Sequence, residues 1–232
     1  MKILAIETST MLGGIAITDD ASGLIAEARL NVKSTYSERL MTEIDHVLNN
    51  SGLAISDIDV FAVAIGPGSF TGLRIGLTTV KGFSCATGKP IVAVPTLEAF
   101  AWNFSYSRYP VCTLLDARRK EVYAALFQWA GDGFIRLVAE VSIKVERLLE
   151  ETKRLPDERI IFAGEGATIY KNEIMHAMGE KVIFAPHEKM MPSPANVAYM
   201  GMNKALKGEF SEPVSLVPFY LRKSEAEIKW NV

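Results

Sequence analysis

The chain begins with short apolar segments that are separated by polar turn residues. Ile3–Ile6, Gly13–Thr18 and Leu24–Leu30 have the length and composition of strands. Because the connections between them are short, we expect an antiparallel meander. Val60–Ile65 is a continuous apolar run, typical of a strand that is buried on both faces, and Ile91–Val94 predicts one strand more.

Apolar residues at helical spacing predict helices between these strands. Thr35-x-x-Glu38 is a capping-box signature that precedes the first helix. Its apolar positions are Leu40, Met41, Ile44, Val47 and Leu48. The glycine-rich turn Gly66-Pro67-Gly68-Ser69 precedes a second helix over 70–86, and a short helix is expected over 96–106.

The same order of elements is predicted again in the rest of the chain. Strands are expected at Val111–Asp116, Glu121–Trp129, Phe134–Val141, Arg159–Ala163 and Val182–Ala185. Helices are expected at Val145–Thr152, Thr168–Met178 and Pro194–Leu206, the last with Ser193 as its N-cap. A β-β-β-α-β-α-β block therefore occurs twice, which predicts an internal duplication. The first lobe would span 1–107 and a thinner second lobe 108–190. The C-terminal helix and extended tail, 191–232, would pack back on the lobes.

Composition narrows the function classes. The 232 residues are 49% hydrophobic and 22% charged, as in an ordinary globular protein that folds without disulfides. The 25 basic and 27 acidic residues are spread evenly over both halves, so neither half has the charge to grip nucleic acid unaided. Apolar runs fall well short of the roughly 20 residues of a membrane span, and the start lacks a signal-peptide pattern. Cys85 and Cys112 are too few for a disulfide framework, so we expect a cytoplasmic protein without a membrane partner.

The histidines do not predict a metal site. His46, His176 and His187 are far apart, and they form no pair at the spacing of a zinc site. We therefore expect no metal, although a carboxylate-bound Mg²⁺ needs few protein ligands and is harder to exclude.

The most informative segment runs from Gly66 to Gly76, between a predicted strand and a predicted helix. Backbone amides at such a junction can bind an anion, yet the segment matches neither the P-loop nor the dinucleotide-binding glycine pattern. Phosphate binding is one interpretation. The favoured alternative is a tight turn, with Gly72 and Gly76 one helical turn apart so that a neighbouring element can approach closely.

Polar residues end the first strand of each half. Glu7, Thr8 and Ser9 follow the first strand, and Asp116, Ala117 and Arg118 stand at the matching place in the second half. Such turns could hold a phosphate or Mg²⁺ and could face each other across a cleft, together with Gly66 and Gly68. The simpler alternatives are a hydrogen-bonded turn and a solvated hairpin.

Several segments resemble the TsaB family, also called YeaZ, in order and spacing along essentially the whole chain. They are Ile3–Ser9, Tyr36–Leu40, Gly66–Gly76, Asp116–Tyr123 and Tyr220–Arg222. The resemblance implies an α/β fold of the actin/Hsp70/sugar-kinase (ASKHA) type, with two lobes built from duplicated β-β-β-α-β-α units. The sequence departs from the family at Tyr36, where His is frequent, so any role of that His is in doubt here.

The resemblance also implies a role in making N6-threonylcarbamoyladenosine (t6A) in tRNA. TsaB of that family is a non-catalytic partner of its paralogue TsaD, and the ATPase TsaE joins them. No cofactor of its own is implied, ATP is used by the complex, and tRNA is bound only through the complex. TsaD has two metal-binding histidines where this chain has Thr96 and Phe100, and neither residue replaces imidazole. Glu165 interrupts the adenosine-binding glycine loop of the fold.

The resemblance places the partner surface on the two helices of the first lobe. The expected contact residues are Leu40, Met41, Ile44, Leu48, Gly72, Leu73, Arg74, Gly76, Leu77, Thr78 and Phe83. About half of the apolar ones are expected to face this chain's own sheet instead. Without TsaD, such a surface is expected to form a homodimer.

Two other classes stay open. An ATP-dependent phosphotransferase of the ASKHA fold needs a carboxylate at the end of the first strand, which Glu7 supplies, but it also needs an uninterrupted adenosine loop. A metallopeptidase needs the histidine pair that Thr96 and Phe100 replace.

Overall fold

The computed structural model describes residues 1–31, 36–156 and 159–222, with the backbone alone at 30–31 and 36–38. It divides into two compact units. Unit 1 contains Met1–Ala99 and Pro192–Phe219, and unit 2 contains Phe100–Met191 together with the described residues 220–222. The C-terminal helix therefore belongs to unit 1, and residues 100–107 lie in unit 2 although the sequence placed them in the first lobe.

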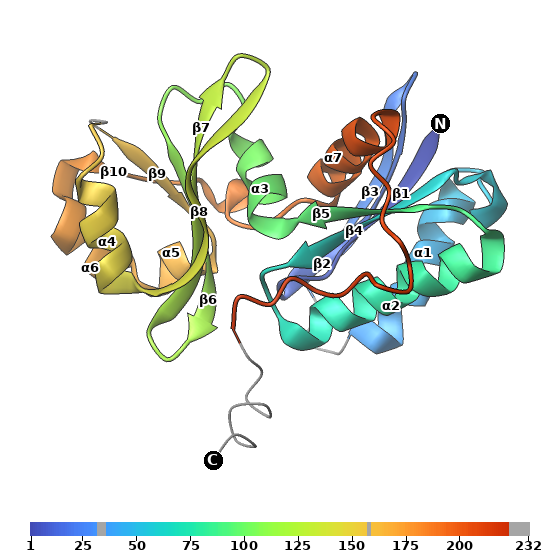
Figure 1. The fold of residues 1–232 in the computed structure, drawn as a ribbon, viewed down its shortest axis with the longest axis horizontal. Coiled ribbons are helices and arrows are strands. Elements are labelled where there is room, and N and C mark those ends of the chain that lie inside the picture. The colour runs from blue at the N-terminus through green and yellow to red at the C-terminus, as the bar shows by residue number, and fades with distance from the viewer. Residues whose placement is uncertain (32–35, 157–158, 223–232) are drawn as a thin grey trace. The chain divides into compact units, whose positions relative to one another are not determined.

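Unit 1 is a five-stranded sheet between helices (Figure 1). Its strands are β1 (Lys2–Glu7), β2 (Leu12–Asp19), β3 (Gly23–Asn31), β4 (Val60–Gly66) and β5 (Ile91–Pro95), in the order β3-β2-β1-β4-β5. The predicted meander β1–β2–β3 is antiparallel, whereas β4 and β5 are parallel to β1. Helices α1 (Tyr36–Asn50) and α2 (Phe70–Thr87) cover one face, and α7 (Pro194–Leu206) covers the other.

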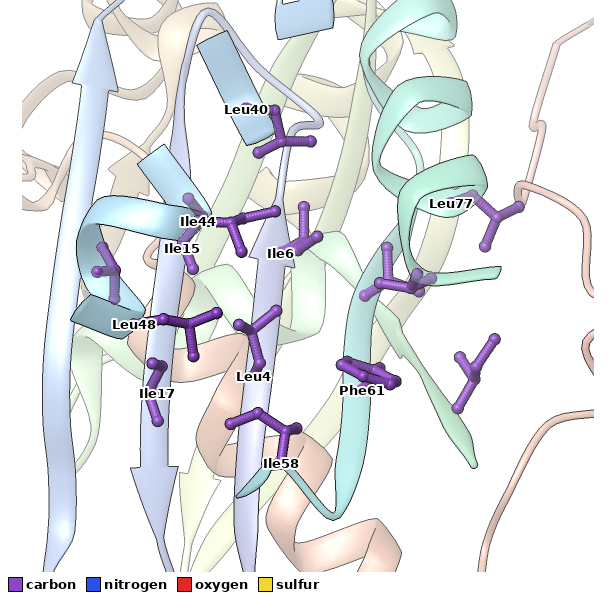
Figure 2. Packing of buried hydrophobic residues seen from close by; sticks show 14 residues of the cluster. Leu4, Ile6, Ile15, Ile17, Leu40, Ile44, Leu48, Ile58, Phe61 and Leu77 are labelled. Atoms are coloured by element: carbon purple, nitrogen blue, oxygen red, sulfur yellow. The ribbon is translucent and has the colours of Figure 1, made fainter. Parts of the chain in front are cut away.

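The core of unit 1 forms where α1 and α2 meet the sheet. Leu40, Ile44 and Leu48 extend from α1 onto strand residues such as Ile6 and Ile15 (Figure 2). Leu77 brings α2 into the same cluster. Because each fully buried aliphatic side chain contributes about 1.5–3 kcal/mol, this cluster is the main reason that both helices stay on the sheet.

Unit 2 repeats the topology of unit 1. Its strands are β6 (Val111–Arg118), β7 (Glu121–Ala130), β8 (Gly133–Lys144), β9 (Ile160–Ala163) and β10 (Val182–Phe184). Their order, β8-β7-β6-β9-β10, is that of unit 1 with each strand replaced by its counterpart, and β6 again pairs antiparallel with β7 and parallel with β9. Helices α4 (Val145–Lys153), α5 (Glu165–Ile169) and α6 (Lys171–Met178) belong to this unit. The predicted duplication is confirmed at the level of strand order.

Three predicted helices differ in detail. The helix expected over 96–106 is α3 (Thr96–Ala101), followed by a 3-10 turn at Trp102–Phe104. The helix expected over Thr168–Met178 is two helices, because Tyr170 leaves the helical conformation between α5 and α6. Ser193 begins α7, but its side chain makes no cap bond to the helix. The capping box at Thr35 and Glu38 lies outside the described side chains.

The helix α7 is capped by a side chain from β3 instead. Glu27 Oε1 accepts hydrogen bonds from the Ser193 hydroxyl at 2.7 Å and the Ala195 amide at 3.2 Å. A carboxylate is well suited to the positive end of a helix, so this contact fixes the start of α7 against the sheet.

Candidate functional site

The end of β1 is a fully buried polar turn in unit 1. Glu7, Thr8, Ser9 and Thr10 are all buried. The Ser9 amide donates to Glu7 Oε1 at 2.6 Å, and the Thr8 hydroxyl donates to the Gly72 carbonyl at 2.8 Å. The turn is therefore held both by itself and by the start of α2.

The glycine-rich loop closes directly over this turn. The Ser69 amide donates to the Ser9 carbonyl at 2.6 Å, and a Cβ on Gly68 would lie 2.5 Å from that same carbonyl oxygen. Only a residue without a side chain fits at Gly68. Ser69 then caps α2, because its hydroxyl oxygen accepts from the Gly72 amide at 3.3 Å.

Gly72 and Gly76 pack against this chain's own turn and not against a partner. A Cβ on Gly72 would clash with the Thr8 carbonyl, and a Cβ on Gly76 would clash with the Thr8 hydroxyl. The sequence correctly indicated a close approach at these glycines. The expectation that they admit a partner's helices is wrong, because the first strand fills that space.

Three amides of the glycine-rich segment bond groups of the chain itself. The Ser69 amide donates to the Ser9 carbonyl, and the Gly72 amide donates to the Ser69 hydroxyl oxygen. The Gly66 amide donates to the Thr96 hydroxyl oxygen at 3.1 Å. An anion site at such a loop needs amides that point at the ligand. Of the two interpretations of Gly66–Gly76, the tight turn is therefore the one that this geometry supports.

Glu7 is the electrostatic anomaly of the site. Burial raises the pKa of its carboxyl to about 7, although the Ser9 hydroxyl and then the Ser9 amide oppose the shift. Within the described residues, neither Glu7 Oε2 nor the Ser9 hydroxyl has a hydrogen bond of good geometry, so the hydroxyl lies close enough to lower the pKa of Glu7 without forming a well-directed bond. A group with this pKa changes charge near neutral pH, at a cost that depends on its burial.

The matching turn of unit 2 is a strained, charged hairpin. Arg118, Arg119 and Lys120 all have positive φ angles, 66°, 55° and 61°. The Arg118 amide donates to Asp116 Oδ1 at 3.0 Å, and Arg222 donates to the Ala117 carbonyl at 2.8 Å. A sharp two-strand turn with exposed cations fits the hairpin interpretation. The expectation that this turn and the Glu7 turn face each other across a cleft stays a prediction.

Glu165 of α5 and Tyr170, between α5 and α6, lie beside Asp116. Burial raises the pKa of Glu165; the hydrogen bond from the Asp116 amide and the charge of Arg118 oppose that shift, whereas the Asp116 carboxylate adds to it. Burial, followed by Asp116, also raises the pKa of Tyr170. The carboxyl groups of Glu165 and Asp116 thus lie together, an arrangement that is unfavourable for a nucleotide's phosphates although Arg118 offsets part of the charge.

Most of the predicted partner residues are in the core of unit 1. Leu40, Ile44, Leu48, Leu73 and Leu77 are buried, so the structure corrects their assignment to a surface. Phe83 is half-buried and stacks on Phe61, with ring centroids 5.4 Å apart. Helical spacing identified the apolar face correctly, and that face meets the sheet.

A different set of residues forms the outer surface of the two helices. Met41, Arg74 and Thr78 are exposed as predicted, with 55% of Met41 accessible. Sequence reasoning missed Thr71, Gly82 and Cys85, which are exposed on α2. Thr71, Thr78, Gly82 and Cys85 are successively seven, four and three residues apart, which is helical spacing. These positions lie opposite the buried stripe of α2, and this spacing was the signal in the sequence that could have identified them. We call Met41, Thr71, Arg74, Thr78 and Gly82 the outer helix face.

Thr96 and Phe100, which the resemblance to the TsaB family set against two histidines of TsaD, are buried. Thr96 accepts the Gly66 amide, and Phe100 packs against Phe104 with ring centroids 6.5 Å apart. Across the described ranges, no group of three or more His, Cys, Asp or Glu side chains could hold a metal ion. In the same part of the chain, no helix is both long and apolar enough to cross a membrane.

Comparisons with known proteins match this architecture. The family model described as "TsaD: tRNA N6-adenosine threonylcarbamoyltransferase" matches residues 26–230. The tRNA threonylcarbamoyladenosine biosynthesis protein TsaB of Bacillus subtilis is 34% identical over 99% of this chain and 98% of its own length. The chain belongs to the TsaB family.

Solved structures support the same assignment. A crystal structure from Pseudomonas aeruginosa, described as similar to peptidase YeaZ, has a TM-score of 0.81 at 25% identity and covers 95% of this chain and 99% of its own. A candidate N-acetylmannosamine kinase from Listeria monocytogenes has a TM-score of 0.50 at 10% identity, covering 88% of this chain and 100% of its own. The fold is thus the ASKHA-like α/β fold that the resemblance implied, and this TsaB-family chain takes part in t6A biosynthesis.

Proposed function

We propose that this chain is a non-catalytic accessory subunit of the t6A complex, which pairs with TsaD and is joined by TsaE. The observation that carries the proposal is the closed first-strand turn, over which the amides of Gly66, Ser69 and Gly72 bond the chain's own atoms. The buried Thr96 and Phe100 at the transferase's histidine positions add to it. The chain has no cofactor of its own, ATP is used by the complex, and tRNA is held through the complex in the cytoplasm.

The outer helix face is the surface that we assign to TsaD. It combines an exposed apolar side chain, Met41, with small residues that allow another helix to come close. A Cβ on Gly82 would meet open space, in contrast to one on Gly76. In the absence of TsaD, a second copy of the chain occupies the same face and forms a homodimer.

Gly82→Trp tests this surface without touching the core. The indole would project from an exposed helical position, so the chain should fold normally, while close helix approach is blocked. Overpacking at an interface costs about 1–3 kcal/mol, which corresponds to roughly five- to a hundredfold weaker binding. Binding to purified TsaD is measured by titration calorimetry, and the fold by a thermal melt.

Glu150→Trp is the matched control, because Glu150 is an exposed residue of α4 in unit 2. It should bind TsaD like the unchanged chain. If Gly82→Trp has an unchanged thermal melt and still binds TsaD with wild-type affinity, the interface does not lie on α2.

The alternative is an ATP-dependent phosphotransferase of this fold, which the carboxylate of Glu7 at the end of β1 favours. It predicts ATP hydrolysis by the isolated chain and its loss in Glu7→Gln. The accessory-subunit proposal predicts negligible hydrolysis and no t6A formation until TsaD and TsaE are added. Turnover by the chain alone that depends on Glu7 would reverse the choice.

A further inference from the structure

Unit 2 carries an exposed group of aromatic rings that the proposed function does not use. The Trp129 ring lies at the centre, with centroids 5.3 Å from Trp102, 5.1 Å from Phe134 and 4.7 Å from Tyr106. Trp102, Trp129 and Phe134 are half-buried, whereas Tyr106 is 83% exposed. We call these four residues the aromatic patch.

Tyr106 is held outward at a cost in backbone energy. Its φ is 64°, in the left-handed region that bulky side chains avoid, and this conformation costs of order 1 kcal/mol or more. One side of its ring meets Trp129 at an interplanar angle of 47°, and the high exposure leaves the rest of the ring accessible. A strained residue that presents an accessible ring suggests a ligand that stacks on it.

Two cations without a described ion-pair partner lie on the segments that flank the patch. Arg108 follows Tyr106, and its carbonyl accepts a long hydrogen bond from Gln128, next to Trp129, at 3.4 Å. Lys189 is tied to the segment that contains Trp102, because Asn103 donates to its carbonyl at 3.4 Å. Both side chains are exposed, and no described acidic group pairs with them. The acidic residues near these cations in sequence are Glu188, which is exposed and directly precedes Lys189, and Asp132, in the turn before Phe134.

We propose that the aromatic patch stacks an unpaired nucleobase of an RNA loop, while Arg108 and Lys189 meet the adjoining phosphates. Rings that carry bases together with cations that track the backbone are the usual chemistry of single-stranded RNA sites. The proposal rests on the proposed function, since that function brings a tRNA to the complex. Two cations give weak binding alone, in keeping with the even charge distribution of the chain.

The test uses the full chain carrying Trp230→Phe, so that the remaining tryptophans, Trp102 and Trp129, report from the patch. Quenching of their fluorescence is titrated at low salt with an RNA stem-loop and with a fully paired RNA duplex of the same base composition. The stem-loop should quench the fluorescence and bind more tightly. Tyr106→Asn should weaken stem-loop binding roughly 5- to 100-fold, because stacking on one aromatic ring is lost.

Asn tolerates the left-handed conformation, so Tyr106→Asn should leave the melt unchanged or raise it. Tyr106→Phe keeps the ring and should bind like the parent chain. Arg108→Gln should weaken binding and reduce the salt slope by about 0.7, and Asp132→Asn should strengthen binding.

Equal binding of stem-loop and duplex, or a stem-loop affinity that Tyr106→Asn leaves unchanged, would overturn the proposal. If Tyr106→Asn instead changes the oligomeric state or the affinity for TsaD and spares RNA binding, the patch is a protein contact and the proposal is wrong. If the proposed accessory role is wrong, the unchanged chain will not bind TsaD. That result is measured separately from the RNA titration.

Discussion

Glu7 is the residue at which burial and charge conflict most strongly. Its carboxyl is fully buried, only one of its two oxygens accepts a described hydrogen bond, and it forms no described ion pair. Burial accordingly raises its pKa to about 7. In the unfolded chain the pKa is close to 4.5, so the folded protein holds this proton more tightly.

We predict that this single group makes the protein less stable as the pH rises through neutrality. Where the folded state binds more protons than the unfolded state, the free energy of unfolding falls with pH, here from about pH 4.5 to above pH 7. The contribution lost over that window is about 3 kcal/mol. Glu7→Gln should remove this pH dependence and be more stable than the unchanged chain at pH 8, by urea unfolding at several pH values.

The exposed Glu209→Gln serves as the control for loss of one carboxyl group and should keep the pH dependence. A Glu7→Gln protein whose stability still falls between pH 5 and pH 8 as in the parent chain would show that Glu7 is not the group responsible.

At the residue scale, sequence identified Glu7 as chemically special but not why. A carboxylate at the end of a strand is visible in the sequence. Its burial depends on Gly68 and Ser69 closing over Ser9, a contact between residues about sixty positions apart. No local sequence pattern shows that these distant residues are in contact. From the sequence alone, a carboxylate that binds a ligand therefore cannot be distinguished from a carboxyl group that is buried in the core.

At the element scale, α2 has two kinds of glycine. Gly76 faces the Thr8 hydroxyl at the end of β1, and Gly82 faces open space. Helical periodicity assigned the element and its apolar stripe correctly, because Leu73, Leu77 and Val80 repeat at the right interval. It could not tell whether that stripe meets the sheet or a partner, since both surfaces select the same residues.

The two glycines should therefore respond to the same substitution with opposite signs. Gly82→Ala should stabilise the protein by about 0.5–1 kcal/mol, because alanine is the better helix former and its methyl group meets nothing. Gly76→Ala should destabilise by about 1–3 kcal/mol, because the methyl group displaces the Thr8 hydroxyl from the Gly72 carbonyl. The denaturant midpoint of each variant, compared with that of the unchanged chain, measures the sign of its change in stability. Stabilisation by both substitutions would mean that α2 does not pack on Thr8 as described.

At the scale of the whole molecule, the duplication explains both the success and the limits of sequence reasoning. Strand order is predictable because the same pattern of elements occurs twice. In each half, an antiparallel meander with short turns fixes the order of the first three strands. The discontinuity of unit 1 is not visible in that pattern. It arises because α7, at the far end of the chain, fills the second face of the first sheet, with Gly201 close to Ala62.

This discontinuity predicts that two truncations will affect different units. A chain ending at residue 219 keeps α7 but loses Arg222, which donates to the Ala117 carbonyl and pairs with Glu121 at 3.5 Å. It should weaken unit 2 slightly, by about 1 kcal/mol, because these contacts are partly exposed. A chain ending at residue 191 also loses α7, whose inward residues cover one face of the unit 1 sheet. They are Val197, Ala198, Met200, Gly201, Met202 and Ala205.

Without α7, the buried face of β1 and β4 would be open to water, and unit 1 should lose its cooperative unfolding transition. Hydrogen exchange followed by mass spectrometry separates the two units, because each peptide reports its own segment. We expect amides of β1 and β4 to exchange rapidly in the chain ending at residue 191, while those of β6 and β7 stay protected. The chain ending at residue 219 should show normal protection in β1 and β4. Slow exchange of β1 and β4 in the shorter chain would mean that α7 is dispensable, and that the first lobe folds from a continuous segment after all.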